Sequence, residues 1–524
     1  MINSIQMLKD TIGERFGLGV KNVQSPGDDE IMVSGRAEKM LELLDFLAID
    51  CDARFVAQFV NDAGSNLELI DVLFLNHLRS RVYVKIDIDA RDKKTDSITG
   101  IFPAAKWLEK YQTQFLSIDF QPRAASPKGE DGGLAMDASS PWVQFQVDDM
   151  VDKSRLPGGP GIFDPKLDLF SYTWVKTDKT VIFANRCQIG HFHRGILKFA
   201  ESLPISELPP VVARACWRDK WHALAAVAIA IERAAGIAEK IPQHAAYWRA
   251  FCCELERVKN HHEFLISWLQ LAGHFAIAKR NASILRGLEA IEKHLLDEAT
   301  RTPFLVPGGI LFDPVATGRL SRPAIEECLH DYEHDFTSAL LDPLEKNYLF
   351  DAFAGIGIIH KDAALKAGLT GPALRASGVP YDTRVDFPHG PYKQGFLRWD
   401  TCTGVTGDVQ ARIEIHAREI VQSLRLLYQL NALLAETPVS EASRIDASNL
   451  VAGAEGFAVV ESARGELHAY VKASKEAGKL ATLRICTPSF QNFTALERVA
   501  GQVAIRKMPY IVHSINPCWA CIDQ

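Results

Sequence analysis

Two cysteines near the end of this sequence have the residue type and spacing for a metal centre. Cys518 and Cys521 are separated by two residues and follow Pro517, so both sulfur atoms can face one point. Thiolates are soft, electron-rich ligands that suit soft metals. A buried pair without a metal, or a pair holding zinc or another metal, are the alternatives that the sequence leaves open.

The chain has ten cysteines, which for its length indicates a reducing compartment and not a disulfide scaffold. Most stand alone, and we expect these to be small buried hydrophobic side chains: Cys51, Cys187, Cys328, Cys402 and Cys486. The adjacent Cys252 and Cys253 lie in a helical pattern and are expected to pack.

Two arginines lie beside glycines in predicted tight turns. Arg375 is in the string RASG, and Arg464 precedes Gly465. Glycine allows backbone angles that other residues rarely adopt, so these arginines should be held in place. An arginine near a buried centre supplies a fixed charge and a rigid fork of donors. For Arg375 the alternative is a structural ion pair with Asp382 or Asp386.

The elements that would position these residues fall into two regions. Residues 1–120 are predicted to form a small α/β domain, with helices at 40–47 and 107–115 and strands at 67–74 and 82–88. A stretch rich in proline, glycine and serine follows, and we assign 121–155 as a linker.

The second domain, 156–524, is predicted to be mainly helical with small sheets. Helical spacing is strongest at 245–278 and 410–434, whereas 456–524 alternates strand and turn patterns before the final cysteines. The fold class is therefore α+β.

Composition excludes several classes of function. A net charge of −7 gives no basic face for nucleic acid. The longest apolar run, 223–231, is too short to cross a bilayer, so we expect a soluble chain that docks on membrane subunits. No Gly-x-Gly-x-x-Gly follows a predicted strand, and the cysteines are too scattered for a [4Fe–4S] cluster within this chain.

Residues 97–120, SITGIFPAAKWLEKYQTQFLSIDF, resemble the signature of the complex I 30-kDa subunit. The matching positions are Phe102, Pro103, Ala104, Trp107, Glu109, Ile118 and Phe120. The departures are Tyr111, Gln112, Thr113, Gln114 and Ser117.

From Gly158 to Gln524 the sequence resembles the complex I 49-kDa subunit and the large subunit of group 4 [NiFe] hydrogenases, of the hydrogenase-4 and formate hydrogenlyase type. Eight motifs occur in the family order, which is far more specific than any one alone. They are IGHFHRGILKFAE at 189–201, Glu256–Arg257 with Asn260–His261, VPGG at 306–309, GLTGPALRASGVPYDTR at 368–384, 407–412 with 419–423, ESARGELHAY at 461–470, TPSFQN at 487–492 and NPCWAC at 516–521. The resemblance places the strings at 461–470 and 487–492 on strands that line the cofactor cavity.

The resemblance also implies a ligand set. Hydrogenases of this family bind nickel and iron through four thiolates from two Cys-x-x-Cys pairs. The final pair is intact, but the first is represented by Cys216 and Asp219, with Trp217 where glycine is usual. The implied metal ligands are Cys216, Asp219, Cys518 and Cys521, and a carboxylate is a hard substitute for a bridging thiolate.

The implied catalytic residues are Arg464, His193 and Arg194. Arg464 matches the arginine that overhangs the metal, and the other two match the family's His-Arg-Gly helix start. On the quinone side, complex I relatives carry a histidine in a Gly-Pro-x-His-Pro loop. The matching loop here, 158–163, has none, and Trp268 and Leu271 stand where relatives often have His or Asp.

The resemblance thus implies a subunit of a membrane-associated oxidoreductase related to complex I or to energy-converting hydrogenases. It would form a cavity next to the [4Fe–4S] cluster of a small, 20-kDa-like partner and couple electron transfer to ion translocation by membrane subunits of complex I or antiporter type. NAD and quinone would belong to the whole complex, a Ni-Fe centre is doubtful, and the location would be the cytoplasmic side of the cell membrane. The alternatives are an active hydrogen-evolving [NiFe] hydrogenase and a non-catalytic structural or coupling subunit.

Overall fold

The structure is a computed structural model that describes most of the chain. The described residues are 2–17, 19–27, 29–62, 66–122, 142–146, 172–177, 181–187, 193–216, 218–296, 302–346, 349–393, 395–437, 444–499, 503–504 and 507–522. Two compact units are present. Unit 1 comprises Met1–Ala138, Asp362–Leu369 and Phe490–Arg498; unit 2 comprises Ser139–Lys361, Thr370–Ser489 and Val499–Gln524.

Unit 1 is built on a five-stranded sheet in the order β1-β2-β5-β4-β3. Its strands are β1 (Val20–Gln24), β2 (Glu30–Gly35), β3 (Ala53–Asp62), β4 (Asn66–Leu75) and β5 (Ser80–Asp89). β2 and β5 are parallel, and the other neighbours are antiparallel. A short parallel pair, β6 (Lys94–Asp96) and β7 (Asp119–Gln121), accompanies the sheet.

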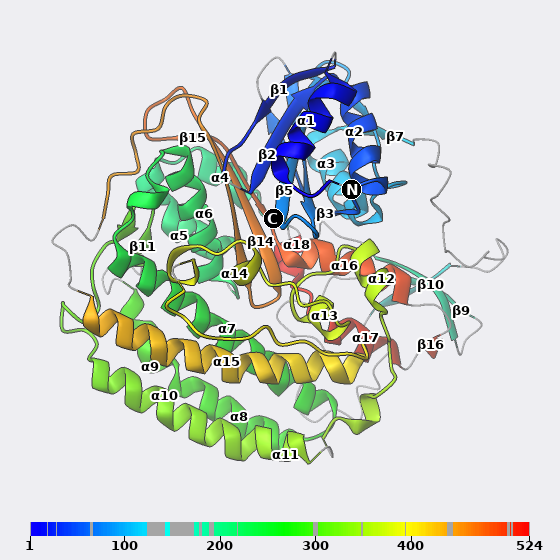
Figure 1. The fold of residues 1–524 in the computed structure, drawn as a ribbon. Helices are drawn as coiled ribbons and strands as arrows, with labels where there is room; N and C mark the ends of the chain where they lie inside the picture. The colour runs from blue at the N-terminus through cyan, green and yellow to red at the C-terminus, as the bar shows by residue number, and fades with distance from the viewer. Residues whose placement is uncertain are drawn as a thin grey trace. The chain divides into compact units, whose positions relative to one another are not determined.

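Three helices belong to the same unit: α1 (Ile5–Phe16), α2 (Ala37–Ile49) and α3 (Lys106–Leu116). In α2, Met40, Leu43 and Leu47 recur at three- and four-residue spacing and are fully buried. That spacing gives the helix one apolar face, which lies on β2, β3 and β5 (Figure 1).

Unit 1 also takes two segments from far along the chain. The ring of Trp107, on α3, lies 5.2 Å edge-on from Phe493. Gln491 donates a hydrogen bond to the carbonyl of Val56. An added Cβ at Gly368 would lie 2.6 Å from the Cβ of Ala104, which shows how closely the other segment packs.

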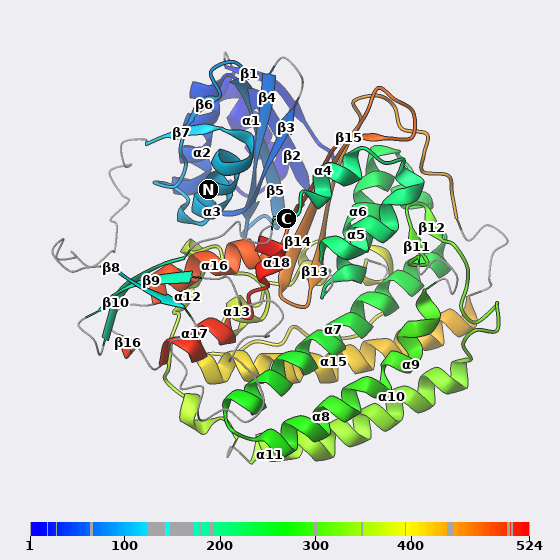
Figure 2. The same cartoon turned by 180° about the vertical axis from the view of Figure 1, so that it is seen from behind.

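Unit 2 is mainly helical. Its longer helices are α5 (Leu208–Ala215), α6 (Lys220–Ala234), α7 (Gln243–Leu271), α8 (Phe275–Gly287), α10 (Arg322–Phe336) and α15 (Val409–Glu436). Shorter helices are α4 (Ile196–Glu201), α9 (Glu289–Glu292), α11 (Asp342–Glu345), α13 (Gly371–Ala376), α14 (Thr383–Asp386), α17 (Met508–Ser514) and α18 (Trp519–Ile522). Helix α12 (Lys361–Lys366) begins at the end of a unit 2 segment, but the rest of it belongs to unit 1. α7 and α15 lie side by side in both views, with α8 and α10 beside them (Figures 1 and 2).

The sheets of unit 2 are small. β13 (Glu455–Ser462), β14 (Gly465–Ala473) and β15 (Leu480–Cys486) form an antiparallel sheet against which α6 packs (Figure 2). β8 (Trp142–Gln146), β9 (Tyr172–Thr177), β10 (Val181–Cys187) and β16 (Val503–Ala504) form another, and β11 (Leu305–Val306) pairs with β12 (Gly309–Ile310).

The predicted α+β class is confirmed, and the predicted elements at 40–47, 67–74, 82–88, 107–115 and 410–434 are all present. The pattern at 245–278 is broken between α7 and α8, where Gly273 has a φ of +83°. The loop at 158–163 and most of the predicted linker, 121–155, lie outside the described residues, and the described part of that linker includes the strand β8.

The prediction for the C-terminal tail is wrong in part. After β15 the described chain is largely helical, with α16 (Pro488–Val499), α17 and α18. The string 487–492, expected on a strand, instead follows one strand and begins α16. Pro488 explains the change, because proline is favoured in the first turn of a helix and cannot donate to a sheet.

Among the described residues, no helix is both long enough and apolar enough to cross a membrane.

The turn between β11 and β12 gives a test of the fold. Gly308 has a φ of +88°, and an added Cβ would lie 1.8 Å from the carbonyl oxygen of Ile445. We expect Gly308→Ala to lower the free energy of unfolding by at least about 1–3 kcal/mol, the usual cost of such backbone strain alone. Chemical denaturation would measure it.

The matched control is Gly287→Ala, because a Cβ at this helical glycine would meet nothing within 4 Å. Its unfolding free energy should stay within about 1 kcal/mol of wild type or rise. Equal effects of the two changes would contradict the turn geometry.

Candidate functional site

Three cysteine sulfur atoms meet in the interior of unit 2. The Sγ atoms of Cys216, Cys518 and Cys521 all lie within 4.8 Å of one another, and all three side chains are buried. Those of Cys216 and Cys521 are 2.7 Å apart, although 305 positions separate the residues. The structure therefore brings together the three cysteines that the sequence marks as candidate ligands.

Cys216 is placed by the end of α5. The helix stops at Ala215, and Cys216 has an extended backbone with φ −132° and ψ 96°. Nη2 of Arg194 donates a hydrogen bond of 3.0 Å to the carbonyl of Ala215. Arg194 thus contacts the backbone next to the centre and not the sulfur atoms.

The final cysteine pair is held by the segment after β15. The amide of Cys518 donates to Oγ of Ser489 at 2.9 Å, and Oγ1 of Thr487 donates to the carbonyl of Cys521 at 2.9 Å. The amide of Cys521 also donates to the carbonyl of Cys518 at 3.0 Å, which closes one turn and directs both sulfurs to one side. The string 487–492 therefore supports the cysteines, although from a helix start.

Arg464 is carried by a tight hairpin. Ser462 of β13 pairs with Gly465 of β14, which leaves two residues in the turn. The turn packs against the start of α13: an added Cβ at Gly371 would lie 2.3 Å from the carbonyl oxygen of Arg464, and one at Gly465 would lie 2.8 Å from the amide nitrogen of Gly371. Glycine is needed at both positions because the two backbones touch.

The side chain of Arg464 forms an ion pair with Asp219. Nη1 of Arg464 donates to Oδ2 of Asp219 at 2.7 Å, and Nε donates to the carbonyl of Asn516 at 3.1 Å. The amide group of Asn260 donates to Oδ1 of Asp219 at 3.1 Å and to the carbonyl of Arg218 at 2.8 Å. Oδ2 of Asp219 lies 3.7 Å from Sγ of Cys216. The predicted residues Cys216, Asp219, Arg464, Cys518 and Cys521 thus form one centre.

His193 is not part of this arrangement. Its side chain is exposed, and no described contact joins it to the cysteines. Its implied catalytic role stays a prediction.

A nickel–iron centre of the hydrogenase kind does not fit this ligand set. That centre needs four thiolates, two of which bridge both metals, whereas the described residues bring three cysteines together. The fourth position holds a hard carboxylate, both of whose oxygens already accept hydrogen bonds from Arg464 and Asn260.

The three thiols differ in acidity. Hydrogen bonds from Cys216 and Cys521, with the charge of Arg464, hold the pKa of Cys518 well below its ordinary value. The hydrogen bond to Cys518 raises the pKa of Cys216, and burial raises that of Cys521. Of the three thiols, Cys518 therefore loses its proton most readily.

A histidine–glutamate pair, which sequence reasoning did not single out, lies beside Asp219. Glu256 of α7 accepts hydrogen bonds from the amides of Trp221 and His222 at 2.9 and 3.0 Å, and its Oε2 is 2.7 Å from Nδ1 of His222. Burial raises the pKa of Glu256 to about 8. Burial, together with the positive charge of Arg257, lowers the pKa of His222 to about 3. The signal that could have found it is the four-residue spacing of Glu256 and Asn260, which puts both on one face of α7.

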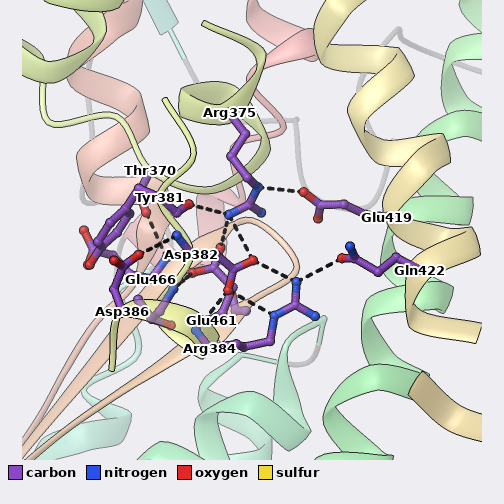
Figure 3. A network of polar contacts seen from close by, with 12 residues as sticks. Thr370, Arg375, Tyr381, Asp382, Arg384, Asp386, Glu419, Gln422, Glu461 and Glu466 are labelled. Carbon is purple, nitrogen blue, oxygen red and sulfur yellow. Dashed lines mark hydrogen bonds and ion pairs between the residues drawn. The ribbon is translucent and has the colours of Figure 1, made fainter. Parts of the chain in front are cut away.

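A network of buried ion pairs lies beneath the hairpin (Figure 3). Arg375 of α13 contacts Glu419 and Glu461 at 2.7 Å each. It also contacts Asp382 at 3.5 Å, so the ion pair predicted with Asp382 is confirmed. The pairing continues through Asp382 to Arg384 at 2.8 Å.

We call these residues, with the next two pairs, the Arg375 network. It comprises Glu254, Arg257, Arg375, Asp382, Arg384, Glu419 and Glu461. Four carboxyl groups face three guanidinium groups, and all seven side chains are buried. If all four carboxyl groups were ionised, the network would carry one uncompensated negative charge, which burial disfavours. Burial, together with repulsion from Asp382, raises the pKa of Glu461 to about 7.

The Arg375 network extends into two histidines. Nε2 of His261 is 2.9 Å from Oε2 of Glu419, and its Nδ1 is 2.7 Å from Nδ1 of His416. Burial opposes ionisation of Glu419, but Arg375 and His261 hold its pKa well below the ordinary value, so this carboxylate only accepts. His261 must then donate from Nε2 and accept at Nδ1, and His416 donates from Nδ1.

The ion pair at the centre gives a stability test. Because both partners are buried, Arg464→Ala leaves Asp219 without its cation and should cost about 3–5 kcal/mol of unfolding free energy. The double variant Arg464→Ala with Asp219→Asn should recover part of that loss, since an amide carries no charge to desolvate. Denaturant unfolding would measure both.

The control is Lys393→Ala, because the Lys393–Glu239 pair is largely exposed. That change should cost at most about 1 kcal/mol. If the two changes at the centre were simply additive, Arg464 and Asp219 would not be coupled.

Glu461 gives a pH test. Its pKa of about 7 in the folded chain exceeds the ordinary 4.5, so the folded state binds the proton more tightly. The stability it contributes is present below pH 4.5 and is lost as pH rises through 7. Glu461→Gln should therefore reduce the fall in unfolding free energy between pH 5 and pH 8 by roughly 2–4 kcal/mol.

Unfolding curves at several pH values, for wild type and Glu461→Gln, would show this, because other titrating groups are common to both. Glu239→Gln, at an exposed site, should leave the pH profile unchanged. Identical profiles for wild type and Glu461→Gln would contradict the raised pKa.

Two family models match this chain, in separate regions. Residues 33–125 match the 30-kDa subunit of the respiratory-chain NADH dehydrogenase, and residues 300–524 match the 49-kDa subunit of the same enzyme. The second region contains Arg375, Arg464 and the final cysteine pair.

Curated relatives are similar over most of their length. The chain is 29% identical over 343 residues to an NADH-quinone oxidoreductase subunit of Clostridium beijerinckii, covering 64% of this chain and 88% of that protein. An NADH-quinone oxidoreductase subunit of Opitutus terrae is 25% identical over 443 residues, covering 77% of this chain and 98% of that protein.

A solved structure has the same fold. A chain of the membrane-bound sulfane sulfur reductase, an archaeal respiratory membrane complex, aligns with a TM-score of 0.63 and 23% identity, covering 75% of this chain and all of that one. Taken in their order along the sequence, the two matched regions show that the chain joins a complex I 30-kDa-type region and a complex I 49-kDa-type region in one polypeptide.

Proposed function

We propose that this chain is a peripheral subunit of a membrane-associated oxidoreductase, next to the [4Fe–4S] cluster of a small 20-kDa-like partner. In this role it couples electron transfer at that cluster to ion translocation by membrane subunits of complex I or antiporter type. NAD and quinone belong to the complex and not to this chain. The proposed location is the cytoplasmic side of the cell membrane.

The observation that carries the proposal is the joining of both matched regions in one chain. Relatives of the second region are named as subunits of NADH-quinone oxidoreductases, and the solved neighbour is part of a respiratory membrane complex. An electron-transfer complex is therefore the setting that best accounts for the chain.

The ligand set of the cysteine centre argues for a coupling role over hydrogen evolution. A carboxylate in an ion pair stands in place of one bridging thiolate. The described residues bring together three cysteines, too few for a cluster of four cysteine ligands. The electron carrier is therefore assigned to the partner.

The Arg375 network supplies an element that can respond to a nearby electron. A negative charge arriving beside it changes the relative energies of protonated and ionised Glu461, whose pKa of about 7 keeps both forms accessible. A proton shift there changes the pairing of Arg375 with Glu419, since both carboxylates share this one guanidinium group. The hairpin and α13 to α15, which carry these residues, are the elements that would move.

The test uses the assembled complex, isolated from membranes through a tag on this chain. A small [4Fe–4S] subunit and membrane subunits should co-purify in equal amounts. Glu419→Gln keeps the shape of the side chain but removes the charge shared by Arg375 and His261. If the Arg375 network carries the coupling, the number of ions moved per electron should fall in this variant while electron transfer continues.

Glu239→Gln is the control, since this carboxylate is exposed. Unchanged coupling in Glu419→Gln would favour a purely structural subunit. Stoichiometric nickel with hydrogen evolution would favour the hydrogenase. Isolation without an iron–sulfur partner would remove the proposal.

A further inference from the structure

We propose that a groove along α15 is the docking site for an amphipathic helix of a partner subunit, with basic side chains at one end of that helix and acidic side chains at the other. This surface has such a role only if the chain works inside a complex, so the proposal rests on the proposed function. It adds which surface of this chain the partner covers and which chemistry the partner segment carries.

The groove is lined by α15, by residues 397–403 and by the end of α11, and it encloses about 1080 Å³. Small-molecule sites usually enclose roughly 300–1,000 Å³. On α15 the lining includes Glu414, Arg418, Val421 and Arg425, at spacings of four, three and four residues. One side of the helix therefore faces the groove over about 16 Å. An elongated site of this kind fits a helix better than a compact ligand.

Part of the lining is apolar and reachable. Leu341, just before α11, Leu344 within it and Val421 of α15 are all partly exposed. The ring of Trp399 is partly exposed in the same groove. Such side chains receive the large apolar anchors that a docking helix presents at three- and four-residue spacing.

One end of the groove is basic. Nε2 of Gln429 donates to the carbonyl of Arg398 at 3.0 Å and to that of Arg425 at 3.1 Å, which brings these two residues together. Both arginine side chains are exposed. Within the described residues, no carboxylate pairs with either guanidinium group. A partner can therefore supply the missing negative charge.

The other end is acidic. Helix α10 runs antiparallel to α15, since Asn431 donates to Glu326 at 3.1 Å and Tyr428 donates to Glu333 at 3.0 Å. The chain after α10 thus leads towards the beginning of α15, and Glu345 lies at the end of the groove that also contains Glu414.

Of these two carboxylates, Glu414 lies 3.8 Å from Arg418. The exposed Glu345 pairs with no cation in the part of the chain that the structure describes. It therefore remains available to a partner.

These charges select the partner. A docking helix should place basic side chains near Glu345 and acidic side chains near Arg398 and Arg425, with apolar side chains between them. Its dipole adds to the attraction when its amino end lies at the acidic end of the groove. A wholly acidic ligand would be repelled by Glu345 and Glu414, because like charges that face each other are costly.

The floor of the groove contacts the Arg375 network. The ring centre of Trp399 lies 4.2 Å from Cζ of Arg384, and Nη2 of Arg384 donates to Oε1 of Gln422 at 3.5 Å (Figure 3). Trp399 and Gln422 both line the groove. A helix that presses on Trp399 therefore alters the setting of a guanidinium group that pairs with Asp382 and Glu254. The groove is thus a route by which movement of a partner reaches the network.

The test uses the complex isolated from membranes, with the photoreactive residue p-benzoylphenylalanine in place of Val421. After irradiation, mass spectrometry should identify a cross-link to another subunit of the complex. The linked segment should have helical apolar spacing and the order of charges given above. The same photoreactive residue in place of Glu239, which is exposed and lies outside the groove, should not reach that segment.

A charge reversal makes the test specific. Arg398→Glu combined with Arg425→Glu places carboxylates against the acidic end of the helix and should lower the cross-link yield about tenfold or more. Both arginines are exposed, so the chain should still fold, which its melting temperature would verify. Lys240→Glu combined with Arg286→Glu is the matched control, because it changes the net charge equally at exposed sites outside the groove and should keep the yield.

Three results would overturn the inference. They are no cross-link to another subunit in a complex that retains its iron–sulfur partner, a cross-link to lipid, to a second copy of this chain or to a segment without this order of charges, and an unchanged yield in the folded charge-reversal variant. Each of these leaves the proposed function intact. Isolation of the chain without an iron–sulfur partner would overturn the proposed function and this inference together.

Discussion

The ion pair between Arg464 and Asp219 is the contact on which the centre of unit 2 depends. It joins the β13–β14 hairpin to the segment that precedes α6, and through the carbonyl of Asn516 it also reaches the C-terminal turn. Each partner alone would be a buried charge with a large desolvation cost. Three chain segments are therefore fixed relative to one another by a single guanidinium group, and the cysteines lie on two of these segments.

Buried ion pairs also join separate elements in the Arg375 network, which contains more charged residues. Helices α7, α13, α14 and α15 and the strand β13 each contribute a charged side chain that pairs with one from another of these elements. Such a core is more sensitive to charge than an apolar one, because any change in protonation alters several pairings at once. That sensitivity is a liability where the only task is stability.

Much of this arrangement follows from the sequence. Apolar spacing locates α2, α7 and α15, and alternation locates β4 and β5, because these patterns report which face is buried. The glycines beside Arg375 and Arg464 indicate turns, and the turns exist. The ligands Cys216 and Asp219 come from the family resemblance, and spacing within the chain alone does not pair them with residues 300 positions away.

Other features of the site cannot be predicted from such patterns. The Glu256–His222 and His261–His416 contacts join separate helices. The spacing of Glu256 and Asn260 marks one face of α7, but it does not indicate which residue of another helix that face contacts. Tertiary pairing of charges has no period, so it escapes any interpretation that relies on periodicity.

The composition of unit 1 bears on how the chain can mature. Its sheet is complete by residue 89, but two of its packing segments, 362–369 and 490–498, leave the ribosome much later. Trp107 cannot meet Phe493 until nearly the whole polypeptide has been made. Unit 1 therefore cannot complete its packing until late in synthesis. An N-terminal fragment that lacks residues 362–369 and 490–498 would expose an apolar surface that the intact chain covers.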